Sequence, residues 1–126
     1  MAAGLTFDTG ALIALERYDH RMLAVLAAAE EEQLPIHVPA PVLVEWFRGK
    51  PKRFHKILDA VRVEPLTEQL AQIAGEALLG LPNSVSVVDA VVMASAAQRG
   101  DRVYTSDIPD LQHLQIPFPS VKLFKA

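Results

Sequence analysis

The sequence predicts a three-layer α/β domain with a parallel sheet that helices cover on both faces. Short apolar segments typical of strands alternate with segments of helical pattern along the whole chain. This alternation implies right-handed crossovers between parallel strands. The 126 residues, of which 51% are hydrophobic and 21% charged, fit a globular chain with one core. We therefore expect a single domain over residues 1–126.

The expected strands and helices follow one another in a regular order. The strands cover residues 5–7, 36–38, 61–63, 103–105 and 121–124. The helices cover residues 11–17, 19–32, 41–47, 53–60, 67–79, 87–99 and 109–114. Pro41 suits a first helical turn, where its missing N–H costs nothing. Ser86 is a good N-cap, and Gly100 ends the helix that Ser86 begins.

The stretch from Ser86 to Asp110 organises the rest of the chain. Asp89 begins a helix that has almost no polar face and is therefore expected to be buried. From Asp89 to Gln98 that helix runs roughly 15 Å at about 1.5 Å per residue. The strand that follows returns roughly 16–20 Å at about 3.3 Å per residue. Asp107, at the end of the strand, should therefore lie near Asp89.

Two further acids follow strands in the same way. Asp8 comes directly after the first expected strand, and Glu45 lies on the helix that follows the second. In open parallel sheets, ligands bind beyond the carboxyl ends of the strands. We therefore expect Asp8, Glu45, Asp89 and Asp107 to converge at one edge of the sheet.

Each of these acids also has a purely structural explanation. Asp89 and Asp107 could cap helices, Asp8 could close a turn, and Glu45 could pair with Arg48. Together they are harder to explain in this way, because carboxylates brought close together in apolar surroundings repel one another. A hard divalent cation would remove that repulsion, and Mg²⁺ prefers oxygen ligands. The four histidines have no ligand spacing, so we expect them at the surface or in packing contacts.

Composition narrows the class of protein further. With no cysteine, disulfides and thiolate metal sites are excluded. No apolar run is long enough to span a bilayer, and the N-terminus lacks the pattern of a signal peptide, so we expect a soluble, cytoplasmic protein. The net charge of −3 argues against a nonspecific polyanion binder but does not exclude a nuclease. Five of the twelve basic side chains nevertheless lie close together in the sequence: Arg48, Lys50, Lys52, Arg53 and Lys56.

Four segments carry a resemblance to a known family. They are FDTGALIAL at 7–15, PVLVEWFRG at 41–49, VDAVV at 88–92 and YTSD at 104–107. In order and spacing they resemble the motifs of PIN-domain ribonucleases, specifically the VapC-type toxins of toxin–antitoxin (VapBC) pairs. The resemblance covers nearly the whole chain. One departure is Gly10, where the family commonly has serine or asparagine.

The resemblance implies a fold, an activity and a site. The implied fold is PIN-like, with a central five-stranded parallel sheet. The implied activity is that of a Mg²⁺- or Mn²⁺-dependent endoribonuclease that cuts structured RNA such as tRNA or rRNA and inhibits translation. Metal binding is carried over to Asp8 and Asp89, with Glu45 and Asp107 completing the metal-binding and catalytic set. Supporting roles fall to the hydroxyls of Thr9 and Thr105 and to Asp110.

The resemblance also implies partners, namely RNA, a cognate VapB-type antitoxin and a second copy of the chain in a homodimer. Because acids repel phosphates, basic groups must hold the RNA, and the basic side chains between residues 48 and 56 are the local candidates. Trp46 and Phe47 could stack on bases or serve as core or dimer contacts. Two other functions stay open at this point. One is a housekeeping PIN nuclease of RNA maturation, and the other is a catalytically silent binding module of PIN-like fold.

Overall fold

A computed structural model describes residues 3–126 and contains one mixed arrangement of strands and helices over them. The strands are β1 (Leu5–Phe7), β2 (Ile36–Pro39), β3 (Arg62–Glu64), β4 (Arg102–Thr105) and β5 (Leu123–Lys125). The helices are α1 (Thr9–Glu16), α2 (His20–Glu31), α3 (Ala40–Arg48), α4 (Phe54–Asp59), α5 (Glu68–Ala77), α6 (Val87–Arg99) and α7 (Ile108–His113). No helix in this part of the chain is long and apolar enough to cross a membrane.

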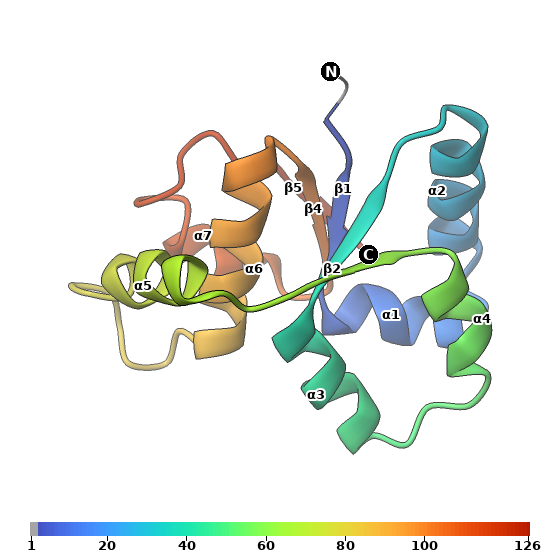
Figure 1. The fold of residues 1–126 in the computed structure, drawn as a ribbon, viewed down its shortest axis with the longest axis horizontal. Coiled ribbons are helices and arrows are strands. Elements are labelled where there is room, and N and C mark those ends of the chain that lie inside the picture. The colour runs from blue at the N-terminus through green and yellow to red at the C-terminus, as the bar shows by residue number, and fades with distance from the viewer. Residues whose placement is uncertain (1–2) are drawn as a thin grey trace.

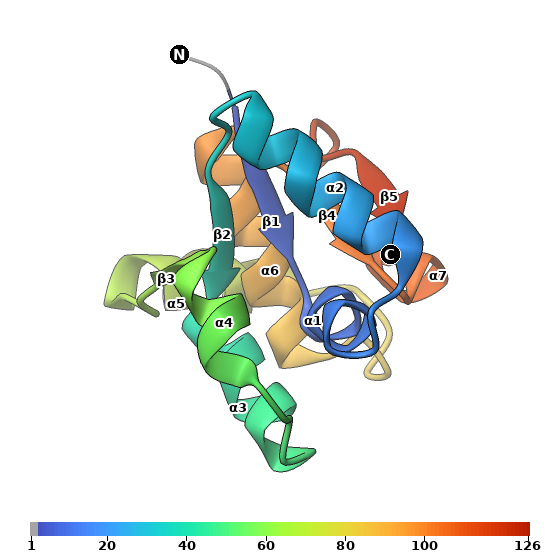
Figure 2. The same ribbon diagram turned by 90° about the vertical axis from the view of Figure 1, so that its right-hand side faces the viewer.

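The five strands form one all-parallel sheet in the order β3-β2-β1-β4-β5. Figures 1 and 2 show α2 and α4 on one side of this sheet and α5, α6 and α7 on the other. Helices α1 and α3 lie at the end where β1 and β2 finish. The predicted fold class, a three-layer α/β domain with a five-stranded parallel sheet, is confirmed.

The expected elements are present, with shifted boundaries. Helix α1 begins at Thr9 rather than at Ala11, so Thr9 and Gly10 form its first turn instead of a separate turn. The shift arises because Asp8 caps the helix, its Oδ1 accepting a hydrogen bond from the Ala11 N–H at 3.0 Å. Strand β5 begins two residues later than predicted, at Leu123. These shifts leave the order of the elements unchanged.

Helix α6 is the centre of the core, as its apolar sequence predicts. Residues 90–96 are all buried, and most of their side chains are small, which lets the helix pack closely on the sheet. Ser86 caps its start, its Oγ accepting from the Asp89 N–H at 2.9 Å. At the other end, Gly100 takes φ +74°, a left-handed conformation that favours glycine and stops the helix.

A buried hydrogen-bond network joins the amino ends of the strands to the end of α6. Asp101 is at its centre and is only 3% exposed. Its carboxylate accepts from the Gly4 N–H at 2.9 Å, the Thr6 hydroxyl at 2.8 Å and the Arg99 Nε at 2.9 Å. The His37 Nδ1 lies 2.9 Å from the same carboxylate. Nothing in the local sequence around Asp101 predicts this network, because its partners come from distant parts of the chain.

The network also determines how Asp101 titrates. Burial alone would raise the pKa of Asp101, but the hydrogen bonds from Arg99 and Thr6 and the charge of Arg99 outweigh it, so that the pKa falls below 3.8. Because the folded-state pKa is lowered, the ionised carboxylate stabilises the fold at neutral pH. That contribution is lost as the pH falls below the ordinary value of an aspartate.

We predict that Asp101→Asn destabilises the protein by about 2–3 kcal/mol at neutral pH, because it removes a charge from partners that stay buried. Urea unfolding followed by circular dichroism measures the loss. Asp59→Asn, which makes the same change at an exposed position, is the matched control. The difference between the two variants should shrink as the parent protein is acidified below pH 3.8. Equal stabilities at neutral pH would show that the network contributes nothing.

Candidate active site

The four acids expected to converge line one cavity at the carboxyl end of the sheet. The cavity has a volume of about 480 Å³ and is open to solvent. Its lining comes from the residue after β1, from α1 and α3, from the start of α6, from the loop after β4 and from α7. The lining residues are Asp8, Thr9, Gly10, Ile13, Glu45, Arg48, Ser86, Asp89, Ser106, Asp107 and Asp110.

Asp8 is the most buried of these acids, with 6% of its surface exposed. Its backbone continues the sheet, since its N–H donates to the Tyr104 carbonyl at 3.2 Å. Burial raises the pKa of Asp8 above 3.8, although hydrogen bonds from Thr105, Ala11 and Gly10 act in the opposite direction. Asp8 therefore does cap α1. A cap alone does not explain its burial, because burying a carboxylate costs free energy and an exposed one could cap the helix as well.

Asp89 lies in the first turn of α6, at the level of Asp8. Burial and the negative charge of Asp8 raise the pKa of Asp89 to about 6, with further increases from Glu45 and Asp107. A hydrogen bond between the Ser86 hydroxyl and the Asp89 side chain opposes this rise in pKa. Repulsion among these carboxylates means that the site holds more negative charge than its own hydrogen bonds neutralise.

Glu45 and Asp107 form the solvent-exposed part of the cavity. Glu45 accepts a hydrogen bond from the Thr9 hydroxyl. Within residues 3–126 it makes no ion pair with Arg48, so the structural explanation for Glu45 is wrong. Asp107 precedes α7, but its side chain makes no capping bond there. A side-chain hydrogen bond with Asp110 raises the pKa of Asp107 instead, which places Asp110 beside the predicted set.

The supporting threonines each hold a different acid. Thr9 bonds to Glu45. Thr105, which is fully buried, bonds to Asp8. The Thr105 hydroxyl also accepts from the Asp107 N–H at 2.9 Å, which fixes the loop after β4. Thr105 therefore links an acid of β1 to an acid that follows β4.

The donor set fits a hard divalent cation in its chemistry. Among the described residues, no three Asp, Glu, His or Cys side chains are close enough to one another to bind one ion together. Mg²⁺ does not require three, because it typically takes one or two carboxylates and keeps several waters. The raised pKa values of Asp8 and Asp89 indicate negative charge that a cation would compensate. The pair thus matches what Mg²⁺ or Mn²⁺ needs from a protein.

Ser106 and Arg48 line the cavity as well. A Cβ at position 10 would overlap the side chain of Ser106, so Gly10 is the residue that fits there. The Ser106 hydroxyl therefore occupies the place of a side chain at position 10, where the resembling family commonly has serine or asparagine. Nothing in the sequence around Ser106 signals this exchange. Arg48 extends from the end of α3 and adds a positive charge to the cavity.

The other basic side chains proposed to hold RNA lie elsewhere. Lys52, Arg53 and Lys56 line a small cavity of about 160 Å³ between α1, α2 and α4. The guanidinium of Arg53 lies over the Tyr18 ring, 4.4 Å from its centroid. Lys50 is exposed in the turn after α3. Arg48 therefore lines the acidic cavity, whereas Lys52, Arg53 and Lys56 line this second one.

The two aromatic residues of α3 separate in the same way. Trp46 is 2% exposed, and its Nε1 donates to Glu16 at 3.2 Å, so it belongs to the core. Phe47 is 40% exposed and packs edge-on against Phe54, with ring centroids 5.0 Å apart. Of the two, Phe47 alone has a surface that a partner can contact.

We predict that Asp89→Asn stabilises the metal-free protein at neutral pH by about 1–2 kcal/mol, allowing for solvent screening. The folded-state pKa of Asp89 is raised to about 6. The parent therefore gains stability below its unfolded value of 3.8 and loses it as the pH rises through 6. Melting temperatures in EDTA, measured from acid to neutral pH, test this. A difference between variant and parent that does not grow with pH would contradict it.

Comparison with known proteins identifies the family. The PIN domain model matches residues 5–109. A search of curated protein sequences found no match. Similar solved structures include DNA-bound VapBC2 from Rickettsia felis, with TM-score 0.78 and 14% identity, covering 97% of this chain and 98% of the other. DNA-bound VapBC from Salmonella typhimurium has TM-score 0.78 and 14% identity, covering 98% of each chain.

A third solved structure, FitAcB from Neisseria gonorrhoeae, has TM-score 0.70 and 20% identity, covering 95% of this chain and 96% of the other. At these identities the structures support the fold, while the family model spans most of the sequence. This chain belongs to the PIN domain family.

Proposed function

We propose that this protein is a Mg²⁺- or Mn²⁺-dependent endoribonuclease and the toxin of a VapBC-type toxin–antitoxin pair. The observation that carries the proposal is the cavity lined by Asp8, Glu45, Asp89 and Asp107, in which burial and mutual repulsion raise the pKa of Asp89 to about 6. PIN domains are generally nucleases that use divalent metals. The proposal combines that chemistry with this arrangement of acids.

In the proposed reaction, each acid has a distinct part. Asp8 and Asp89 would hold the ion, and Thr105 keeps Asp8 oriented through its hydroxyl. When bound, the ion would neutralise charge on the phosphate and make a nearby water more acidic. Glu45, held by Thr9, and Asp107 face solvent and are suited to take a proton from the attacking water.

The proposed reaction is the hydrolysis of a phosphodiester bond. The water oxygen bonds to phosphorus, the bond from phosphorus to the 3′ oxygen breaks, and that oxygen takes up a proton. The products carry a 5′-phosphate and a 3′-hydroxyl. Arg48 lines the same cavity and would hold a non-bridging phosphate oxygen against the repulsion of the acids.

We infer an antitoxin partner and a cytoplasmic location, where structured RNA such as tRNA or rRNA would be the substrate. The supporting observation is that similar folds occur in VapBC and FitAcB structures. A housekeeping PIN nuclease would share the same cavity. Growth arrest on expression, relieved by a short neighbouring gene, separates a toxin from a housekeeping enzyme. A silent binding module is disfavoured, because it would not need all four acids.

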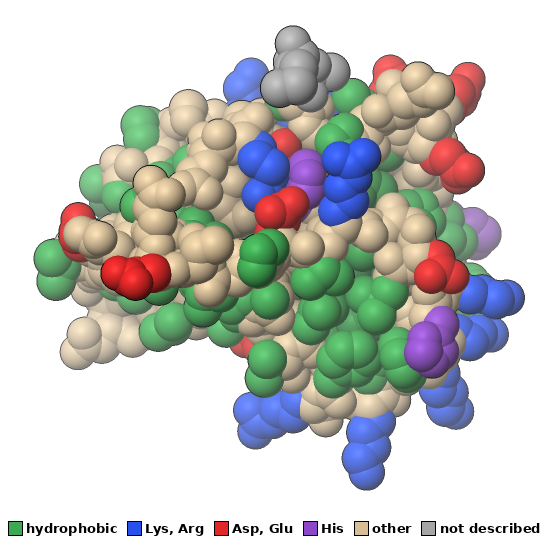
Figure 3. Space-filling model, in the orientation of Figure 1, with side chains coloured by type: hydrophobic (Ala, Val, Ile, Leu, Met, Phe, Trp, Pro, Cys, Tyr) green, Lys and Arg blue, Asp and Glu red, His purple; other side chains and the backbone are tan. Residues whose placement is uncertain are grey.

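We also infer a homodimer that forms through α3 and α4. Figure 3 shows hydrophobic side chains gathered on the surface over these helices, with basic side chains around them. Val44 is 73% exposed and Phe47 40% exposed, one turn apart on α3. Phe54, which contacts Phe47, extends the apolar surface onto α4. An exposed apolar surface of this kind is typical of an interface between proteins.

We predict that Val44→Glu converts the dimer to a monomer, because it places a charge in the centre of that surface. Sedimentation velocity at several protein concentrations measures the change. The control is Ile116→Glu, since Ile116 is 75% exposed and lies outside α3 and α4. A parent that sediments as a monomer would rule out the dimer. A Val44→Glu variant that still dimerises would rule out this surface.

We predict that the purified protein cuts total cellular RNA into discrete fragments with Mg²⁺ or Mn²⁺ but not with EDTA, and that Asp89→Asn abolishes cutting. Either ion at about 100 times its dissociation constant should stabilise the parent by about 2.7 kcal/mol, and stabilise Asp89→Asn much less. Gel analysis and melting curves measure both effects. Glu68→Gln, a neutralised acid on α5 away from the cavity, is the control.

The outcomes of this experiment are separable. Equal cutting by parent and Asp89→Asn would indicate contamination and remove the role of Asp89. No cutting with either ion, together with melting curves that ignore both ions, would favour the binding module. Sequencing of fragment ends would identify the RNA and the bond that is cut.

A further inference from the structure

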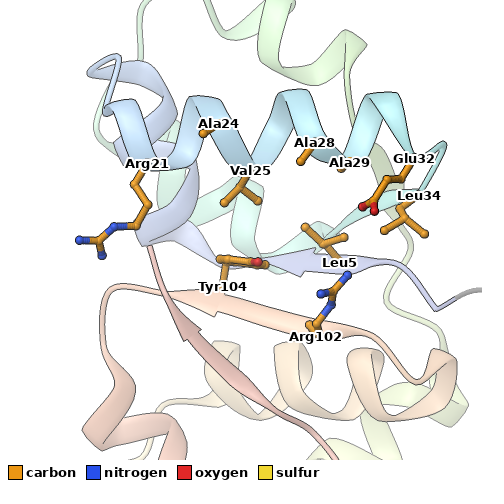
Figure 4. Close-up of a pocket in the computed structure, with 10 residues that line it drawn as sticks. All are labelled: Leu5, Arg21, Ala24, Val25, Ala28, Ala29, Glu32, Leu34, Arg102 and Tyr104. Atoms are coloured by element: carbon orange, nitrogen blue, oxygen red, sulfur yellow. The ribbon is translucent and has the colours of Figure 1, made fainter.

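A second cavity lies on the opposite side of β4 from α6, between α2 and the sheet (Figure 4). It has a volume of about 320 Å³. Small side chains of α2, such as Ala24 and Ala28, form its upper wall, and Leu5, Arg102 and Tyr104 lie below them. We call this cavity, together with the exposed face of β4 and β5 beside it, the α2 groove.

The floor of the α2 groove presents two aromatic rings. Tyr104 and Phe124 are register partners on β4 and β5, so their side chains project from the same face of the sheet. Their rings stack with centroids 5.3 Å apart and an interplanar angle of 25°. Phe124 is 37% exposed, and Tyr104 is partly exposed. Aromatic rings exposed on a sheet face are the surfaces on which single-stranded RNA stacks its bases.

Basic side chains lie at both ends of the groove. Arg21 lies at one end and Arg102 toward the other, with the Tyr104 ring between them in Figure 4. Over residues 3–126, neither arginine makes an ion pair or a side-chain hydrogen bond. Glu32 also lines the groove, near Arg102, without pairing with it. Lys122, which directly precedes β5, is exposed and lies two residues before Phe124.

Of the residues that line the α2 groove, Tyr104 lies nearest along the chain to the lining of the acidic cavity, two residues before Ser106. Tyr104 is followed directly by Thr105, which bonds to Asp8. Asp107 lies three residues beyond Tyr104, at most roughly 10 Å along the chain at about 3.3 Å per residue. The Tyr104 carbonyl also accepts the backbone hydrogen bond of Asp8. A nucleotide near the cleaved bond is therefore within reach of the Tyr104 ring.

We propose that the α2 groove binds the single-stranded RNA that flanks the cleaved bond, with a base stacked on the surface made by Tyr104 and Phe124. Arg21 and Arg102 hold the phosphates on either side of that base. This inference rests on the proposed nuclease function and adds a substrate-binding surface to it. Free cations on both sides of an aromatic surface match the alternation of phosphate and base along RNA. A purely apolar protein segment would leave both arginines without partners.

The experiment measures the affinity of a fluorescein-labelled, mixed-sequence oligoribonucleotide by anisotropy in Mg²⁺. All proteins carry Asp89→Asn, so that the RNA stays intact. Tyr104→Leu keeps an apolar side chain against Phe7 but loses the aromatic face, and it should weaken binding at least about fivefold. Tyr104→Phe should stay within about twofold of its parent, because it keeps the ring.

Arg102→Ala tests the groove without disturbing the core, because Arg102 is exposed. It should weaken binding and reduce the slope of log affinity against log salt by about 0.7, as expected for one lost phosphate contact to a single strand. Arg62→Ala is the matched control, since Arg62 is an exposed arginine at the start of β3, on the other side of β2 and β1. Its salt slope should equal that of the parent. Melting curves confirm that each variant is folded.

Each contrary result has a definite meaning. RNA binding that is unchanged in both Tyr104→Leu and Arg102→Ala overturns the proposal, and it leaves the nuclease standing if the wild-type active site still cuts RNA. Variants that bind RNA normally but no longer self-associate by sedimentation would assign the groove to a second copy of the chain, which also overturns it. A parent that binds no RNA and cuts none would overturn both this inference and the proposed function.

Discussion

The position of the acidic cavity depends on the buried Asp101 carboxylate at the other end of the molecule. The Asp101 carboxylate forms hydrogen bonds with the Gly4 N–H, the Thr6 hydroxyl, His37 and Arg99. These contacts tie the amino ends of β1 and β2 to the last turn of α6. Helix α6 is one continuous helix that is buried along most of its length, so contacts at its last turn help to position its first turn. Asp89 is thereby held level with Asp8.

The acids near the two ends of α6 have pKa values shifted in opposite directions. At the amino end of the sheet, Arg99 and hydrogen bonds compensate Asp101 and lower its pKa. At the carboxyl end, burial and neighbouring acids raise the pKa values of Asp8 and Asp89. The first arrangement stabilises the fold, and the second costs stability in the metal-free protein. Such a cost is typical of a site arranged for a ligand that supplies the missing charge.

The fold, and the convergence of the four acids at one edge of the sheet, could be predicted from the sequence because both depend on local patterns. Alternating strands and helices imply a parallel sheet, and acids that follow strands reach its carboxyl edge. The Asp101 network was missed, because Asp101 and His37 are 64 residues apart and neither lies in a recognisable motif. The basic side chains are close together in the sequence, yet Arg48 lines the acidic cavity whereas Lys52, Arg53 and Lys56 line another, and Lys50 and Arg53 adopt positive φ angles in the segment between α3 and α4. Contacts across the fold decided these points.

The acids that would bind the metal also repel the RNA that the proposed enzyme cuts. With a net charge of −3, the protein has no general attraction for RNA. Attraction must therefore come from cations next to the cavity. Arg48 supplies one cation inside the cavity. Arg21 and Arg102 supply two more in the α2 groove, where they would contact the RNA that flanks the cleaved bond. Stacking on Tyr104 and Phe124 adds affinity that salt does not screen. A nuclease built in this way would hold its substrate mainly beside the cleaved bond, and its choice of RNA would depend on which bases can leave their own stack to reach that surface.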